Sequence, residues 1–443
     1  MHVAIVSLGC AKNLIDSEVM INIIKDGKYE VTNNPYLADI IIINTCGFIE
    51  KAKQESIDTI IEMGQYKKTG KCILLIAAGC LSERYKEELL KEMPELDAVI
   101  GTGDYKSILE VIENGLEGQK ISMYGNQENI DLDKLDRYIS TQNHTAYIKI
   151  AEGCDNRCTY CIIPSLRGRY RSRKFEEIIK EAEFLASKGI KELIVIAQDT
   201  SVYGRDLYGK LMLPDLLRAM AKIRGIEWIR ILYAYPDEFN DDLIDVMASE
   251  EKICKYIDIP IQHGSNKILK LMGRNTTKEK ILHLISKLRK EIPNIAIRTT
   301  FIVGFPGEDE EDFEELANFI KEVQFDRMGV FTYSREEDTP AYKLPNQVDE
   351  EIKINRQDIL MSLQMDISYK KNLGFVGKSL KVLIEDYENG QYIGRTYRDA
   401  PEIDGLVYFT SNREMRIGEF ANVFIKDATD YDLLGECNDE YSK

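Results

Sequence analysis

Short apolar runs of strand length alternate with helical stretches along most of the 443-residue chain. This alternation constrains the fold more than any other feature of the sequence, because apolar strands separated by helices form parallel sheets that the helices cover. A first series extends from Val3 to about Leu116 and predicts an N-terminal α/β domain with a parallel sheet. A second series begins at Thr145 and predicts a (β/α) barrel, complete or partial.

The positions of the apolar runs predict the individual elements. In the first series we expect strands at Val3 to Leu8, Ile40 to Asn44 and Cys72 to Ala77, and helices at Asp16 to Lys25, Glu50 to Met63 and Glu83 to Lys91. In the second series we expect strands at Tyr147 to Ala151, Glu192 to Ala197, Trp228 to Ala234, Tyr256 to Ile261, Ala296 to Val303 and Arg327 to Thr332.

Two other segments complete the predicted organisation. Residues 114–143 are polar and irregular, as a linker would be. Helical sequence from Glu350 to Asn372 precedes short strand-like runs with glycine turns, which predict a small β-barrel. Its expected strands are Ser379 to Glu385, Gln391 to Thr396, Leu406 to Phe409 and Phe420 to Lys426. We therefore predict an α/β protein with an N-terminal domain at 1–116, a linker at 117–143, a central domain at 144–374 and a terminal β domain at 375–443.

Composition excludes several classes of protein. Hydrophobic residues at 44% and charged residues at 30% are typical of a folded globular chain. No apolar run approaches the roughly 18 residues that cross a bilayer, and the first residues enter a strand at once instead of forming a secretory signal. We therefore expect a cytoplasmic protein with no membrane partner. In a reducing compartment, nine cysteines indicate metal ligands or buried thiols and not a disulfide framework.

Three of these cysteines lie in one short loop directly after a candidate strand of the second series. Cys154, Cys158 and Cys161 have the spacing C-x3-C-x2-C. Three thiolates hold three irons of a 4Fe-4S cluster and leave the fourth iron open to another ligand. The alternatives are a structural zinc or free thiols, but zinc would want a fourth ligand, and no His or Cys follows at a short spacing. Because barrel active sites gather at the C-terminal ends of the strands, this loop is the predicted centre of the chemistry.

A second group of cysteines follows strands of the first series. Cys10, Cys46 and Cys80 each lie at the C-terminal end of a candidate strand, next to a glycine. Neighbouring parallel strands end at one edge of the sheet, where open α/β sheets bind their ligands. We therefore predict a second metal centre, although the spacing alone leaves three buried thiols as an alternative. Cys72 lies at the opposite end of the strand that leads to Cys80, so we do not expect it to be a ligand.

The loop has an aromatic residue, Tyr160, directly before its last cysteine, and the pattern C-x3-C-x-aromatic-C resembles the radical S-adenosylmethionine (SAM) superfamily. The resemblance implies that the open iron binds SAM and that one electron from the cluster cleaves SAM to methionine and a 5'-deoxyadenosyl radical. It also implies that Tyr160 lies near the adenine. Such a radical is needed because an unactivated C–H bond offers no acidic proton to a base.

Further contacts to SAM follow from the same resemblance. Gln198 and Asp199, after the second strand of the series, occupy the place of contacts to the sugar or amino group, but they could also cap the strand end. Gly304 could pass close to the adenine, but it could also serve only a turn. Their assignment as cofactor-binding residues is therefore open at this point.

The whole arrangement of modules resembles the methylthiotransferase family along almost the entire chain. The resemblance implies two 4Fe-4S clusters, one held by Cys154, Cys158 and Cys161 and one held by the N-terminal cysteines. It implies that SAM serves both as methyl donor and as radical source, and that the terminal β domain is a substrate-recognising TRAM domain. It further implies an electron donor such as a flavodoxin or a ferredoxin.

The branches of this family modify either an aspartate of ribosomal protein S-twelve or an adenosine of tRNA. Several stretches resemble the ribosomal-protein branch: Ser7 to Asn13 with Asp16 to Glu18, Ile162 to Gly168, Asp258 to His263, Val303 to Glu308, Tyr333 to Glu337, and Gly394 to Thr396 with Asp399 to Gly405. Ala11 departs from the proline that commonly follows the first cysteine, which affects a loop and not a ligand. We therefore expect a methylthio group to be added to the β-carbon of that aspartate.

The charge of the chain favours the same partner, ribosomal protein S-twelve or the small ribosomal subunit. The net charge is −17, and residues 375–443 contain 8 basic and 14 acidic residues, which suits a basic protein better than tRNA phosphates. The basic segment Arg167 to Lys174 is the local exception. It could dock a phosphate, form a solvated connection, or offer one arginine to the carboxylate of the substrate or of SAM. The alternatives to our prediction are a tRNA methylthiotransferase and a non-catalytic iron-sulfur redox sensor that binds the ribosome or RNA.

Overall fold

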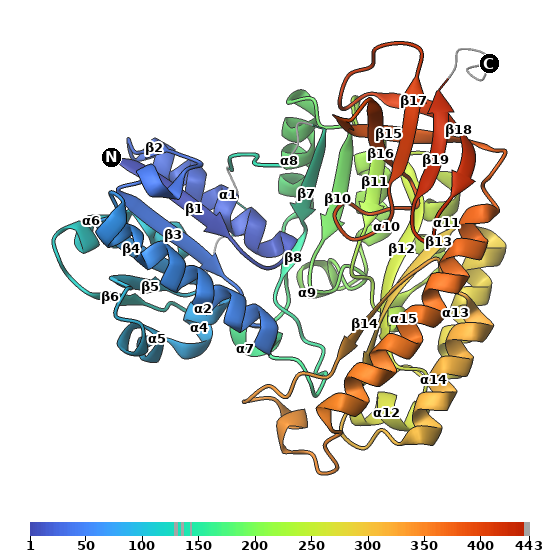
Figure 1. The fold of residues 1–443 in the computed structure, drawn as a ribbon, viewed down its shortest axis with the longest axis horizontal. Coiled ribbons are helices and arrows are strands. Elements are labelled where there is room, and N and C mark those ends of the chain that lie inside the picture. Colours follow the sequence, from blue (N-terminus) through green and yellow to red (C-terminus); the bar gives the residue numbers. More distant parts are fainter. Residues whose placement is uncertain (128–131, 134–136, 142–143, 438–443) are drawn as a thin grey trace.

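The computed structural model describes residues 1–127, 132–133, 137–141 and 144–437. Three modules follow one another along the chain: an α/β domain, a second parallel sheet with its helices, and a small closed barrel (Figure 1). The predicted α/β fold class with these three parts is confirmed. None of the helices in the described residues combines the length and the apolarity that a membrane span requires.

The first sheet has six parallel strands in the order β2-β1-β3-β4-β5-β6. They are β1 (His2–Ser7), β2 (Glu30–Val31), β3 (Ile40–Thr45), β4 (Leu74–Gly79), β5 (Ala98–Ile100) and β6 (Ile121–Met123). Strand β3 is buried along its whole length, because alternate isoleucines pack into separate cores on the two faces of the sheet. Since β6 pairs with β5, this sheet extends beyond residue 116 into the segment that the sequence marks as a linker.

The helices of this domain are α1 (Ala11–Asp26), α2 (Glu50–Gly64), α3 (Tyr66–Thr69), α4 (Cys80–Tyr85), α5 (Glu87–Glu92) and α6 (Ile108–Leu116), with short 3-10 helices η1 (Pro35–Leu37) and η2 (Tyr105–Ser107). Helices α1 and α6 cover one face of the sheet, and α2, α4 and α5 cover the other. The single helix predicted at Glu83 to Lys91 is wrong. Lys86 adopts a left-handed conformation with φ of 51°, which ends α4 and starts α5.

The second sheet also has six parallel strands, in the order β14-β13-β12-β11-β10-β7. They are β7 (Thr145–Lys149), β10 (Glu192–Ile196), β11 (Trp228–Ile231), β12 (Ile253–Gln262), β13 (Ala296–Val303) and β14 (Arg327–Thr332). Within the described ranges β7 and β14 do not pair, so the partial barrel is the right alternative. A small antiparallel pair, β8 (Ala151–Glu152) and β9 (Arg171–Ser172), follows β7.

The helices that follow these strands pack against the sheet in the largest apolar core of the described chain. The longer ones are α8 (Phe175–Ser187), α10 (Leu213–Ala221), α11 (Asp241–Ser249), α13 (Lys278–Glu291), α14 (Glu310–Val323) and α15 (Glu350–Leu373). Short ones are α7 (Ile163–Arg167), α9 (Arg205–Tyr208), α12 (Asn266–Leu271), η4 (Pro236–Glu238) and η5 (Pro340–Lys343). Helix α14 begins with a capping box, in which Asp309 and Asp312 each accept a hydrogen bond from the other's backbone N–H.

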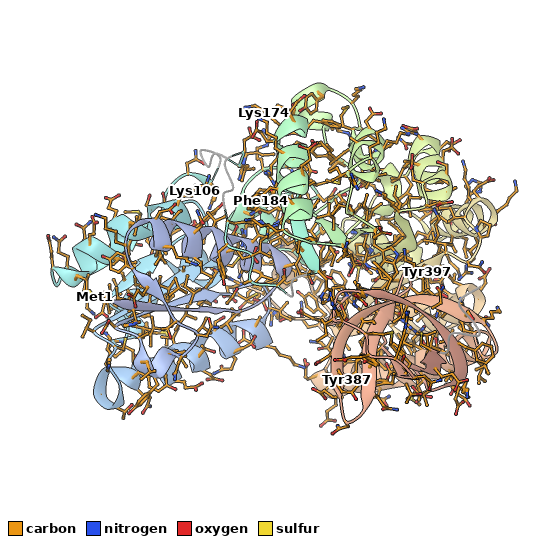
Figure 2. All side chains as sticks on the ribbon, turned by 90° about the horizontal axis from the view of Figure 1, so that it is seen from above. Met1, Lys106, Lys174, Phe184, Tyr387 and Tyr397 are labelled. Carbon is orange, nitrogen blue, oxygen red and sulfur yellow. The ribbon has the colours of Figure 1, made fainter. Side chains whose placement is uncertain are left out.

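The terminal module is a closed five-stranded barrel in the order β15-β16-β17-β19-β18. Its strands are β15 (Ser379–Glu388), β16 (Gln391–Thr396), β17 (Val407–Ser411), β18 (Phe420–Ala428) and β19 (Leu433–Cys437). The sequence predicts four of them and misses β19, whose Gly435 and Glu436 break the apolar pattern of a strand. The barrel rests on the second sheet, and Tyr397 lies at this contact, where its hydroxyl donates to Asn294 O at 3.0 Å (Figure 2).

The three modules meet around the first turns of α1. One apolar cluster contains Ile15 of α1, Ile194 and Ile196 of β10, and Leu383 of β15. The start of α1, where Cys10 lies, is therefore packed against the second sheet and close to the terminal barrel. This junction positions the site described below.

Candidate active site

The N-terminal cysteines gather at one edge of the first sheet. Strands β1, β3 and β4 are neighbours, and the register aligns Ser7 with Asn44 and Thr45 with Gly79. Cys10 follows β1 as the N-cap of α1, Cys46 follows β3 directly, and Cys80 follows β4 as the first residue of α4. Burial raises the pKa of Cys46 and of Cys80, and the nearby charge of Cys10 adds to this rise.

Glycines beside these cysteines leave room for the thiols to approach one another. A Cβ on Gly9, whose φ is +86°, would lie 2.9 Å from Cys46 Cβ and 3.2 Å from Cys46 Sγ. A Cβ on Gly47 would lie 2.9 Å from the carbonyl of Cys80. A side chain at either position would therefore collide with the thiol-bearing backbone, and glycine is required by this close approach.

The second group of thiols lies in the loop between β8 and α7. The backbone N–H of Cys154 donates to Gly168 O at 3.2 Å, and that of Cys161 donates to Cys158 O at 3.1 Å. Arg274 Nη1 lies 3.8 Å from Cys158 Sγ and donates a hydrogen bond to it. Burial raises the pKa of Cys154 and of Cys161 to about 12. The loop is therefore held partly by its own backbone and partly by residues outside it, Gly168 and Arg274.

Both groups have the donor chemistry of an iron-sulfur site. None of the nine cysteines, which all lie in the described ranges, forms a disulfide, so no disulfide competes for these thiols. In the described part of the chain, no three His, Cys, Asp or Glu side chains converge closely enough to hold a metal ion in their present rotamers. A cysteine side chain reorients about χ1 alone, and three thiols on one strand edge or in one loop are the donors that cysteine-ligated clusters use.

A buried ion network that the sequence does not reveal joins the two groups. Lys149 Nζ lies 2.7 Å from both Asp16 Oδ1 and Glu152 Oε2. Arg167 Nη1 lies 2.6 Å from Asp16 Oδ2 and 3.3 Å from Glu152 Oε2. Burial alone would raise the pKa of Glu152, but Lys149 and Arg167 hold it well below its usual range. Glu152 therefore stays charged, and both carboxylates are paired.

Arg167 also contacts the N-terminal thiols. Its Nη2 lies 3.5 Å from Cys80 Sγ and donates to the side-chain oxygen of Asn13. Burial raises the pKa of Cys80 to about 12, and Arg167 opposes this rise. One guanidinium thus connects a thiol of the first group to Glu152, which lies two residues before the first cysteine of the loop. The sequence could not indicate these contacts, because the residues are far apart in the chain and form no short motif.

These contacts correct the interpretation of the basic segment Arg167 to Lys174. Arg167 and Arg173 are buried, with 3% and 1% of their surface exposed, so they form neither a phosphate dock nor a solvated connection. Arg173 Nη1 pairs with Glu181 Oε2 at 2.5 Å. By contrast, the side chain of Arg169 is 78% exposed and lies 3.6 Å from Asp155.

The residues predicted to contact SAM lie near the loop in different environments. Tyr160 packs edge-on against Phe305, with 6.4 Å between ring centroids. Gln198 Nε2 donates to Glu152 Oε1 at 2.9 Å, whereas Gln198 Oε1 is buried without a partner. Asp199 accepts from Asn156 Nδ2 at 2.8 Å and from the backbone and hydroxyl of Ser201. The unpaired amide oxygen of Gln198 is thus an acceptor that a ligand could use.

Gly304 has a role in packing. Its φ is +71°, and a Cβ there would lie 2.2 Å from Cγ of Lys353 on α15. This glycine therefore permits the close contact between the end of β13 and α15, in agreement with the turn alternative. A contact between Gly304 and adenine stays a prediction.

Known families match the chain in three consecutive parts. The family described as "Uncharacterized protein family UPF0004" matches residues 2–101, the radical SAM superfamily matches residues 148–320, and the TRAM domain matches residues 376–437. Ribosomal protein uS12 methylthiotransferase RimO of Thermoanaerobacter sp. (strain X514) is 57% identical over 435 residues, which cover 98% of this chain and 99% of that protein. The chain belongs to the RimO methylthiotransferase family. RimO of Clostridioides difficile (strain 630) is 54% identical over 98% of each chain.

Solved structures share the fold at much lower identity. The radical SAM methyltransferase TsrM of Kitasatospora setae, with cobalamin and a [4Fe-4S] cluster bound, has a TM-score of 0.59 and 15% identity, covering 77% of this RimO family chain and 76% of TsrM. TsrM with tryptophan and a SAM analogue has a TM-score of 0.58 and 13% identity, covering 88% and 79%. These structures support only the fold of this RimO family member.

Proposed function

We propose that the protein is a radical SAM methylthiotransferase that adds a methylthio group to the β-carbon of an aspartate in ribosomal protein uS12. Relatives named RimO, similar over nearly the full chain, support the substrate. The structural observation that carries the reaction type is the bridge formed by Arg167, which contacts Cys80 on one side and Glu152 on the other. A reaction that joins sulfur supply to C–H cleavage requires two such thiol groups at one place.

The six cysteines are the proposed metal ligands. Cys154, Cys158 and Cys161 would hold one 4Fe-4S cluster, and Cys10, Cys46 and Cys80 would hold a second. When bound, the clusters supply one-electron cleavage of SAM and delivery of sulfur, with SAM as both methyl donor and radical source. Tyr160, Gln198 and Asp199 line the SAM side, where Gln198 Oε1 offers a free acceptor to a donor group of the ligand.

The chain's own polar groups prepare this site. Arg167 places positive charge against the thiol of Cys80, which favours the thiolate that ligates iron. Asp16 and Lys149 keep that guanidinium in place, because all three side chains are buried and paired. Packing of α1 on the second sheet keeps the two thiol groups at a fixed separation.

The partners follow from the chemistry and from the charge. Reductive cleavage needs a one-electron donor such as a flavodoxin or a ferredoxin. The net charge of −17 favours the basic uS12, free or in the small ribosomal subunit, over tRNA. Burial of Arg167 and Arg173 weakens the case for a phosphate at the basic segment.

The test is to incubate reduced, iron-loaded protein with SAM and, in separate reactions, with uS12, with assembled small subunits and with tRNA. We expect a methylthio group on uS12, detected by mass spectrometry of its peptides. Modification of tRNA in preference to both protein substrates would contradict the proposal.

A further inference from the structure

Lys12 is a buried cation that forms no ion pair within the described residues. It lies in the first turn of α1, two residues after Cys10, and only 6% of its surface is exposed. Its Nζ makes no hydrogen bond or ion pair with any residue in the described ranges. The ammonium lies over the ring of Tyr233, whose centroid is 3.0 Å away. A buried lysine is normally paired, so this arrangement indicates a partner from outside the chain.

The carboxylates near Lys12 are engaged with other cations. Glu152 pairs with Lys149 and Arg167, as described above. Asp258 pairs with Arg298, whose Nη1 lies 2.7 Å from Asp258 Oδ1. Both carboxylates act on Lys12 only at longer range, as does the thiol of Cys10, which is a proposed iron ligand. Lys12 therefore has no carboxylate partner among the described residues at the junction of the modules.

The aromatic partner of Lys12 is held in an unusual conformation. Tyr233 has φ of 60°, a left-handed conformation that is rare for a bulky side chain and that persists only where the surroundings impose it. Its backbone N–H donates to Asp258 Oδ2 at 3.2 Å, and its carbonyl accepts from the backbone N–H of Thr200 at 3.0 Å. Strand β12 and the segment after β10 thus fix the backbone of Tyr233, whose ring lies against the ammonium.

We propose that Lys12 binds the side-chain carboxylate of the substrate aspartate, with the Tyr233 ring as the floor of the subsite. This inference rests on the proposed function. It follows because a desolvated ammonium with no internal partner binds a carboxylate far better than a neutral group. The position fits, since Lys12 follows the first cysteine of the sulfur-supplying group and faces the second sheet. An adenosine base would offer no anion to this lysine.

The test compares uS12 with a uS12 variant in which the modified aspartate is replaced by asparagine. Equilibrium dissociation constants are measured at one salt concentration for iron-loaded wild type, Lys12→Met and Lys12→Arg. Lys25→Met is the matched control, because Lys25 lies in the last turn of the same helix and also contacts an aromatic ring, Tyr138 at 4.3 Å, but is exposed. SAM binding without uS12 and iron content are measured for every variant.

We expect wild type and Lys25→Met to bind the aspartate form at least about tenfold more tightly than the asparagine form. Lys12→Met should bind both forms equally, and Lys12→Arg should keep part of the preference. SAM affinity and iron content should not change. A merely structural role of Lys12 would weaken the binding of both uS12 forms alike. Loss of the preference for the aspartate form would therefore indicate recognition of the carboxylate.

Three results would overturn the inference. The first is that wild type binds the aspartate and asparagine forms of uS12 with equal affinity. The second is that Lys12→Met binds both forms more weakly by the same factor. The third is that Lys12→Met loses affinity for SAM in the absence of uS12, which would assign the lysine to the carboxylate of SAM. The first needs no enzyme variant, so the inference can be refuted even if Lys12→Met fails to fold. Failure of wild type to modify uS12 at all would instead refute the proposed function.

Discussion

The two thiol groups are built in opposite ways. The loop group is local in sequence, since Cys154, Cys158 and Cys161 lie in one short segment, which backbone hydrogen bonds within it and to neighbouring segments hold in place. The N-terminal group is assembled by the sheet, since Cys10, Cys46 and Cys80 meet only because β1, β3 and β4 pair in one register. The comparison teaches that one site depends on the conformation of a loop and the other on the fold of a whole domain. Arg167 nevertheless links the two sites, because it contacts Cys80 of the N-terminal group and Glu152 next to the loop.

The largest expected effect comes from removing the loop group. Replacing Cys154, Cys158 and Cys161 with Ala should abolish formation of 5'-deoxyadenosine and lower the iron content from about eight to about four per chain. The N-terminal group should keep its iron, because its scaffold is a separate sheet. Chromatography of the SAM cleavage products and iron analysis test this. Persistent SAM cleavage would refute the assignment of the loop.

Removing the N-terminal group should separate the two activities. Replacement of Cys10, Cys46 and Cys80 with Ala should leave SAM cleavage in place and abolish methylthio transfer, since the loop group is built locally. Cys72→Ala is the control, because Cys72 lies before β4, buried in the apolar core on one face of the first sheet. If the triple variant still made product, or if Cys72→Ala lost iron, the comparison would fail.

The contribution of Arg167 to the junction between the sites can be tested by measuring the free energy of unfolding. Arg167→Met should destabilise the protein by about 3–5 kcal/mol, because it leaves Asp16 and Glu152 buried with one cation fewer. Arg169→Met should change the free energy of unfolding by less than about 0.5 kcal/mol, since its ion pair is exposed. Urea unfolding of both variants measures the difference. Equal effects would mean that the bridge by Arg167 contributes nothing to the junction.

A smaller effect concerns the contact with the terminal barrel and should leave both thiol groups intact. Glu192 Oε1 lies 2.8 Å from Arg230 Nε, and Oε2 lies 2.6 Å from Arg395 Nη2 of the barrel. Burial alone would raise the pKa of Glu192, but these arginines lower it from the usual 4.5 to about 2.

Because the folded pKa lies below the unfolded one, the stabilisation is fully present above about pH 4.5 and is lost as the pH falls toward 2. Wild type should lose about 3 kcal/mol more than Glu192→Gln over this interval. Urea unfolding between pH 5 and about 2.5 measures the two curves. Parallel curves would contradict the role of Glu192, and unchanged iron content of Glu192→Gln at neutral pH would show that the thiol groups do not depend on it.

Much of the fold follows from local pattern. Strands β13, β14 and β16 lie at the predicted residues, because continuous or alternating apolar runs specify a strand wherever its neighbours lie. Strands β1, β3 and β4 of the first sheet are predicted to within about two residues, and β4 is shifted to Leu74–Gly79 by its register with β3. The short strands β2, β5 and β6 of the same sheet are not predicted. The break at Lys86 and strand β19 are missed, because neither has a periodic signal of its own.

The candidate site divides in the same way. The sequence by itself determined the six cysteines, the loop and the strand ends that carry them, since a strand followed by glycine and cysteine is a local pattern. Only the tertiary structure decided which charges are buried and which are paired. Arg167 and Asp16 are 151 residues apart, and the unpaired Lys12 meets Tyr233 only across two domains. The strength of an ionic contact depends on distance and desolvation, and both arise only when the modules pack together.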